Sequence, residues 1–172
     1  MTRFTVLVAA PESRSAVQAA AVRAAATIEG VTSIAASPEV VDLAELGPEL
    51  LAPSPSRQVT EALAQVEESD VVLVASPQAH GSYTGLLKVF ADRLPELALA
   101  HAIAVPMAAV DDLRNHRNLE EDLRVLLSDL GAWVIEPGLL LSYGELAQPH
   151  GVIDAWAEVA APALREAIAV AA

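Results

Sequence analysis

Residues 70–76 read Asp-Val-Val-Leu-Val-Ala-Ser, and this stretch decides the fold class. A strand with one solvated face alternates apolar and polar residues, whereas the middle of this run is apolar on both faces. That pattern is typical of a central parallel strand with helices packed on either side. The stretch therefore predicts an α/β protein.

Short apolar runs alternate with helical periodicity on both sides of this strand. We expect further strands at 4–9, 39–43, 101–109 and 133–141, and helices at 13–29, 57–68, 84–94, 119–130 and 152–170. This strict alternation predicts a doubly wound parallel sheet of five strands with helices on both faces.

Local signals suggest where these elements begin and end. Ser13 is placed to cap the first helix, and Gly30 to stop it. The stretch 47–56 contains three prolines, so we expect an exposed irregular loop there.

Length and composition narrow the class of protein. A chain of 172 residues that is 53% hydrophobic is expected to form one domain over 1–172. The 10 basic and 23 acidic residues give a net charge of -13, which disfavours nucleic acid as a partner. Without cysteine there is no disulfide, thiolate metal site or iron–sulfur cluster.

Hydrophobicity alone does not indicate a membrane protein here, because alanine supplies much of it. No stretch reaches the roughly 18 to 20 uninterrupted apolar residues that a membrane span needs. The apolar segment at 4–10 is interrupted by Pro11 and Glu12, and we interpret it as a strand instead of a signal peptide. We therefore expect a cytoplasmic protein that does not interact with membranes.

Ligands of doubly wound sheets bind beyond the carboxyl ends of the strands, so four loops are candidates for a site. They are 10–15, 77–83, 107–118 and 142–150. In the first loop, Ser13, Arg14 and Ser15 combine two hydroxyls and a guanidinium at a helix N-terminus, which would suit a phosphate. A cap at Ser13 and a solvated Arg14 explain the same residues without a ligand, and Glu12 would oppose an anion.

The second loop is longer and richer in hydrogen-bonding groups than a minimal connection requires, which favours a binding loop. Its candidate residues are Pro77, Gln78, Ala79, His80 and Gly81. His80 could act as a general acid or base, although a lone loop histidine is more often a polar contact.

The segment from 76 to 95 carries a family resemblance. Ser76-Pro77, Tyr83-Thr84-Gly85, Leu87-Lys88 and Asp92-Arg93-Leu94-Pro95 match, in order and spacing, the flavin-ring segment of NADPH-dependent FMN reductases in the flavodoxin-like superfamily. The similarity is greatest to the reductase components of alkanesulfonate monooxygenase systems. Ser13-Arg14-Ser15 likewise resembles the phosphate-binding Ser-Arg-Ser of that family.

The resemblance implies a flavodoxin-like sheet with strand order 2-1-3-4-5. It implies FMN, with its phosphate at Ser13, Arg14 and Ser15 and its ring against the backbone of 77–81, and NADPH or NADH as the hydride donor. No catalytic side chain and no metal are expected, because the cofactors carry the chemistry. Relatives of this kind pair as homodimers or homotetramers, and a monooxygenase would use the reduced flavin.

Three departures indicate that the flavin-binding loops are eroded. Glu12 stands where the family has an arginine, Ala79 where it has a tyrosine, and the stretch 108–112 replaces a Gly-Gly turn. Two alternatives therefore stay open. One is a non-catalytic binding or assembly subunit that uses the helical stretches 86–94 and 119–130. The other is a site rebuilt for a different ligand around His80, Asp111, Asp112 and His116, whose spacing fits no known metal motif.

Overall fold

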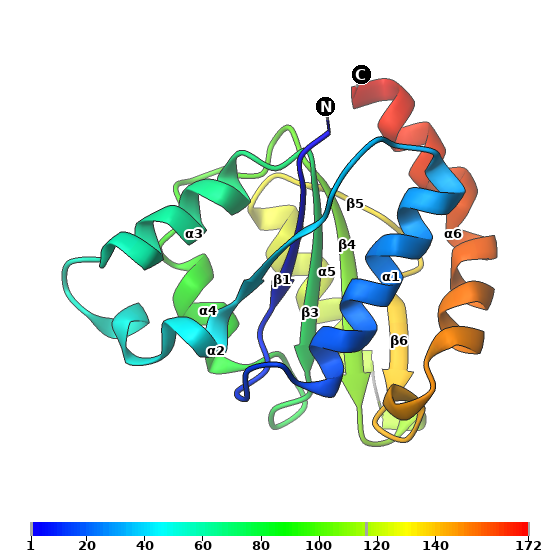
Figure 1. Cartoon of the computed structure of the whole chain (residues 1–172). Helices are drawn as coiled ribbons and strands as arrows, with labels where there is room; N and C mark the ends of the chain where they lie inside the picture. Colours follow the sequence, from blue (N-terminus) through cyan, green and yellow to red (C-terminus); the bar gives the residue numbers. More distant parts are fainter. Residues whose placement is uncertain (1, 116, 172) are drawn as a thin grey trace.

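The computed structural model describes residues 2–115 and 117–171, which form one parallel sheet flanked by helices (Figure 1). Its strands are β1 (Phe4–Val8), β2 (Glu39–Asp42), β3 (Val71–Pro77), β4 (Ile103–Val110), β5 (Trp133–Val134) and β6 (Leu139–Ser142). Their order is β2-β1-β3-β4-β5, and β6 also pairs with β4. The predicted strand order is confirmed, with one additional strand.

Alternate side chains of β3 enter the two hydrophobic cores on opposite faces of the sheet. Val71, Leu73 and Ala75 join the core under α1 (Ala16–Thr32) and α6 (His150–Ala171). Val72 and Val74 join the core under α2 (Leu43–Leu46), α3 (Arg57–Glu67), α4 (Gly85–Ala91) and α5 (Arg117–Asp129). The stretch 70–76 is therefore apolar on both faces because helices cover both sides of the sheet, as predicted.

Small side chains bring α1 close to the sheet. Ala20, Ala21, Ala24 and Ala25 are completely buried in the core that Ile28 also enters. Because alanine adds little bulk beyond the backbone, the helix axis can approach β1 and β3 closely. The alanines of α1 thus allow the helix to pack closely on the sheet.

The ends of α1 differ from the prediction. Ser15, not Ser13, is its N-cap, and the Ser15 hydroxyl accepts a hydrogen bond from the N–H of Gln18 at 3.2 Å. Arg14 has φ of +53°, so the helix cannot begin before it. Gly30 lies inside the helix, which continues to Thr32 and ends at Ser33, a cap residue in the left-handed conformation. Glycine lowers helix propensity without stopping a helix whose next turn still packs on the core.

The stretch 47–56 is more regular than predicted. A 3-10 helix, η1 (Gly47–Leu51), follows α2 directly, and Leu50 is buried. Pro48 lies in its first turn, where the missing proline N–H has no partner to lose. Two further 3-10 helices, η2 (Leu113–Asn115) and η3 (Glu145–Ala147), follow β4 and β6.

The predicted strand at 133–141 is interrupted, which creates the sixth strand. β5 pairs with β4 at Ile103 and Ala104, and β6 resumes the pairing at Met107. Pro106 of β4 faces the gap and Pro137 lies within it, and neither proline can donate a backbone hydrogen bond. A Cβ on Gly138 would lie 3.0 Å from Pro106 Cγ and 3.1 Å from Pro106 O.

The closing helix α6 is two residues longer at its N-terminus than predicted. The indole N–H of Trp156 donates to Pro137 O at 2.8 Å, so α6 also holds the interruption between β5 and β6. Of the helices formed by residues 2–115 and 117–171, none combines the length and the apolar character needed to cross a bilayer.

Replacing Gly138 by alanine should lower the free energy of unfolding by about 1–3 kcal/mol, because the added methyl is forced against the Pro106 ring and carbonyl. Replacing Gly30 should instead raise it by about 0.5–1 kcal/mol, since that helical position has open space around it. Urea unfolding of both variants measures the two changes. Equal stability of the two variants would contradict this account of the interruption.

Candidate functional site

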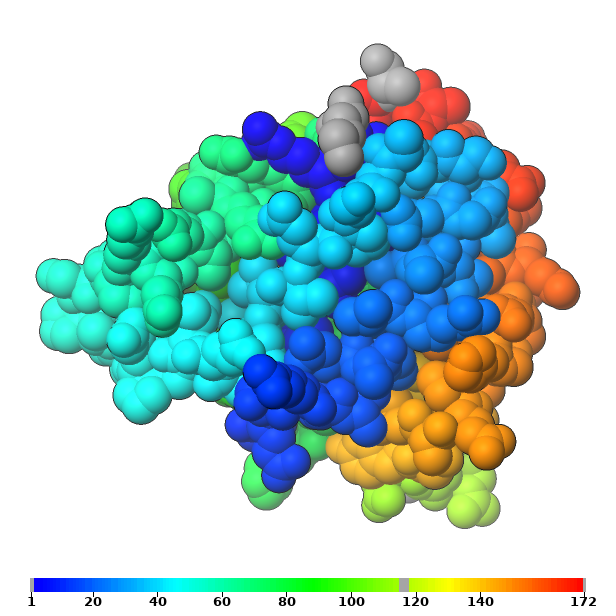
Figure 2. Space-filling view, viewed as in Figure 1, coloured from blue at the N-terminus to red at the C-terminus, as the bar shows by residue number. Residues whose placement is uncertain are grey.

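The carboxyl ends of β1, β2, β3, β4 and β6 meet at one edge of the sheet, at the bottom of the view in Figure 1. The loops after β1, β3, β4 and β6 gather there. In Figure 2 the blue loop after β1 and the green loop after β3 form one projection on this edge. The structure thus brings the two predicted groups, Ser13 to Ser15 and Pro77 to Gly81, to the same place.

The loop after β1 presents three exposed side chains, those of Glu12, Ser13 and Arg14. Among the described residues, neither the Ser13 hydroxyl nor the Arg14 guanidinium has a hydrogen-bond or ion-pair partner. The backbone is different, because the Arg14 N–H donates to Gln18 Oε1 at 3.0 Å and to Asp42 Oδ2 at 3.2 Å. The side chains of this loop are available to a ligand, and the Arg14 N–H is already engaged.

Asp42 is a residue of this edge that the sequence reasoning did not single out. It ends β2, is 7% exposed, and accepts a second hydrogen bond from the Ala44 N–H at 3.0 Å. An aspartate directly before a helical segment is an N-cap signal, which could have identified that half of its role. Its contact with Arg14 depends on the pairing of β2 with β1 and has no local signal.

The loop after β3 is a tight turn. Ala79 and Ser82 exchange two backbone hydrogen bonds of 2.8 and 3.1 Å. The residues between them, His80 and Gly81, have φ of +49° and +86°, as a two-residue hairpin turn with both central φ angles positive requires. The His80 side chain is exposed at the tip and makes no hydrogen bond to another described residue.

Two buried hydroxyls fix this turn relative to the loop after β1. Thr84 Oγ1 donates to Ala9 O at 2.7 Å, and the Thr84 N–H donates to Ser76 Oγ at 3.2 Å. Gln78 N–H donates to Ala109 O at 2.8 Å, which ties the turn to β4 as well. The turn is therefore held by three strands, and Ser76 and Thr84 are polar residues in otherwise buried surroundings.

The remaining two loops pair mostly within themselves. Asp112 Oδ1 accepts hydrogen bonds from Arg114, from its backbone N–H at 2.9 Å and its Nε at 3.2 Å, and these lower the pKa of the Asp112 carboxyl, the backbone bond most. Tyr143 Oη donates to Gln78 O at 3.2 Å and so braces the turn. His116, part of the alternative rebuilt site, lies outside the described residues. Within 2–115 and 117–171, no three side chains of the histidine, aspartate or glutamate type gather as metal ligands would.

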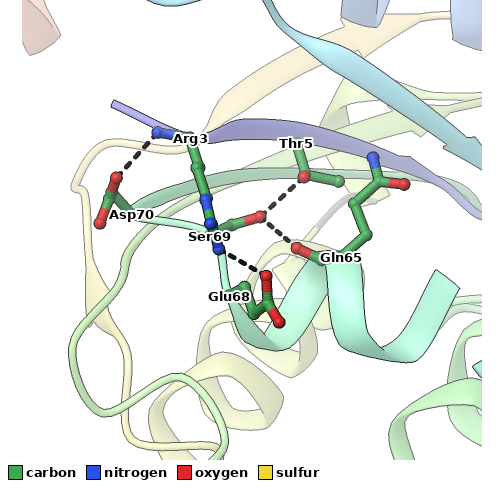
Figure 3. Close-up of polar contacts among 6 residues, drawn as sticks. All are labelled: Arg3, Thr5, Gln65, Glu68, Ser69 and Asp70. Carbon is green, nitrogen blue, oxygen red and sulfur yellow. Dashed lines mark hydrogen bonds and ion pairs between the residues drawn. The ribbon is translucent and has the colours of Figure 1, made fainter. Parts of the chain in front are cut away.

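A hollow of about 670 Å³ lies at the opposite, amino edge of the sheet. Figure 3 shows that several of its polar groups satisfy one another: Thr5 Oγ1 and Ser69 Oγ lie 2.7 Å apart, and Ser69 Oγ donates to Gln65 O at 2.7 Å. Arg3 pairs with Glu68 in the same cluster. These contacts attach β1 to the connection between α3 and β3, which is a structural role.

Comparison with known proteins relates this chain to a family. Residues 2–145 match the family model described as NADPH-dependent FMN reductase. A curated relative, FMN reductase (NADPH) of Pseudomonas putida, is 31% identical over 86 residues, which are 50% of this chain and 44% of the relative. The corresponding Escherichia coli protein is 29% identical over 86 residues, so the match spans less than half of either curated relative's length.

Solved structures agree on the fold. An oxidoreductase from Corynebacterium diphtheriae superimposes with a TM-score of 0.81 at 26% identity, covering 98% of this chain and 97% of that one. The apo form of an NADH:FMN oxidoreductase superimposes with a TM-score of 0.82 at 23% identity, covering 96% and 89%. The family match includes β1, β3 and both predicted site loops, and it confirms the resemblance seen in 76–95. The chain therefore belongs to the NADPH-dependent FMN reductase family.

Proposed function

We propose that this chain is an NAD(P)H-dependent flavin reductase that passes a hydride from NAD(P)H to FMN. The observation that carries this proposal is that the family match contains both loops that the fold brings together at the carboxyl edge. In the curated relatives, the same activity is stated in the name, FMN reductase (NADPH).

The residues at this edge fit a flavin, and they fit its ring better than its phosphate. The N–H groups of His80 and Gly81 have no backbone partner among the described residues and lie at the tip of a turn held rigidly by Thr84. The Ser13 hydroxyl and the Arg14 guanidinium are free for an anion in the same sense. Two features disfavour the phosphate: the negative charge of Glu12, and the Arg14 N–H, which is already hydrogen-bonded within the protein.

Bound flavin and nicotinamide would supply the redox chemistry, so the protein needs no acid or base for hydride transfer. The work of this chain is to position the two rings. Tyr143 braces the carbonyl of Gln78, and Ser76 and Thr84 hold the turn against the loop after β1. Because three strands fix the turn, its backbone can form a preorganised surface for the flavin ring.

Three finer points belong to this proposal. A partner monooxygenase, as in alkanesulfonate systems, would receive the reduced flavin. The chain would work in the cytoplasm, where reduced nicotinamide is available. It would assemble as a homodimer or homotetramer through α4 and α5, and the exposed side chain of Val125 on α5 supports an apolar interface.

Replacing Arg14 by alanine should weaken FMN binding by about 1 kcal/mol, roughly fivefold, since an exposed guanidinium is partly screened. Titration followed by flavin fluorescence measures the affinity, and NADPH oxidation measures turnover. Arg57→Ala, at an exposed position of α3, is the matched control and should change neither. Wild-type protein that binds no flavin would instead support the non-catalytic assembly subunit.

Replacing Glu12 by arginine should strengthen FMN binding by about three- to tenfold at low salt, because a repelling charge becomes an attracting one. The gain should shrink at high ionic strength, since Glu12 is exposed. An unchanged affinity at low salt would show that the phosphate does not bind beside this loop.

The interface proposal predicts a sedimentation mass at micromolar concentration that is a multiple of the 17.9 kDa chain. Val125→Glu on α5 should shift the protein toward monomer, because it places a charge in the apolar contact. Val159→Glu, at a more exposed valine of α6, should leave the mass unchanged. A wild-type monomer would refute the assembly.

A further inference from the structure

The carboxylate of Asp42 is held in place on both of its oxygens. Oδ1 accepts from the Ala44 N–H at 3.0 Å and Oδ2 from the Arg14 N–H at 3.2 Å. Its backbone is fixed by the pairing of Asp42 with Val8, and its side chain is nearly buried. The carboxylate is therefore part of the built structure of this edge and cannot turn away into solvent without breaking both bonds.

The N–H of Arg14 has no capacity left for a ligand. Gln18 Oε1 and Asp42 Oδ2 share its one hydrogen, and the N–H of Gln18 is capped by Ser15. An anion is most stable where free N–H groups and the positive end of a helix dipole coincide. Beside the start of α1, the Arg14 N–H is already paired with an anion from within the protein, the Asp42 carboxylate.

A phosphate monoester would bring about 1.5 to 2 further negative charges to this place at neutral pH. It would meet the carboxylate of Asp42 beside the loop and that of Glu12 within it. The positive charge that remains, on the exposed Arg14 side chain, is screened by solvent. The uncharged isoalloxazine ring meets none of this repulsion, because its proposed contacts are with the turn at 77–81.

We infer that Asp42 sets the flavin preference of this chain, so that riboflavin binds at least as tightly as FMN. This inference rests on the proposed flavin reductase function. It requires no new chemistry, since the same ring accepts the hydride in both flavins. Asp42 acts on specificity through the Arg14 N–H and is a positioning residue.

The test compares the dissociation constants of riboflavin and FMN for the wild type, Asp42→Asn and Glu45→Gln, at low and at high salt. Asparagine is as good a helix cap as aspartate, so the bond to Ala44 can be kept while the charge is removed. Asp42→Asn should strengthen FMN binding by about tenfold and change riboflavin binding by less than about twofold. Glu45→Gln removes one exposed charge from α2 and should change neither constant at high salt.

The outcomes are distinguishable. If neither flavin binds the wild type, the proposed function fails. If both flavins bind and FMN binds much more tightly, the inference about Asp42 fails while the proposed function stands. The same holds if Asp42→Asn keeps the wild-type unfolding midpoint and leaves the ratio of the two dissociation constants unchanged. The inference is supported if Asp42→Asn gains FMN affinity that persists at high salt and Glu45→Gln does not. If Asp42→Asn unfolds, the ratio of the riboflavin and FMN dissociation constants of the wild type still decides.

Discussion

The burial of β3 on both faces is the constraint on which the rest of the structure depends. A strand with Val and Leu on each side needs two helical layers, and α1 with α6 and α3 to α5 supply them. Parallel neighbours on both sides of β3 require crossovers, so the strands run in one direction and their connecting loops gather at one edge. The convergence of the loops is therefore a consequence of covering β3.

Hydrogen bonds from buried polar groups then make that edge rigid. Ser76, Thr84 and Asp42 are among the few buried polar residues. Thr84 and Asp42 each bond to a segment distant in sequence, and Ser76 accepts from the N–H of Thr84. A buried polar group without a partner is costly, so these bonds restrict the loops to one arrangement. The turn at 79–82 and the loop after β1 consequently keep fixed positions even though both are exposed.

The same rigidity decides which charges at this edge stay in a fixed place. An exposed charge such as Glu12 or Arg14 can swing away and is screened, whereas Asp42 is held against a backbone N–H. The proposed preference among flavins therefore rests on Asp42 more than on Glu12 or Arg14.

The sequence alone determined the layers, the strand order and the edge at which the candidate loops gather, because apolar periodicity and the motif at 76–95 are local patterns. It placed Ser13 to Ser15 and Pro77 to Gly81 at that edge correctly. It misplaced the cap of α1, since the positive φ of Arg14 arises where the loop turns toward Asp42. Tertiary structure alone decided the interruption beside Pro106 and the contact between Asp42 and Arg14, because both depend on which residues face each other across neighbouring strands, and that register is a property of the assembled sheet.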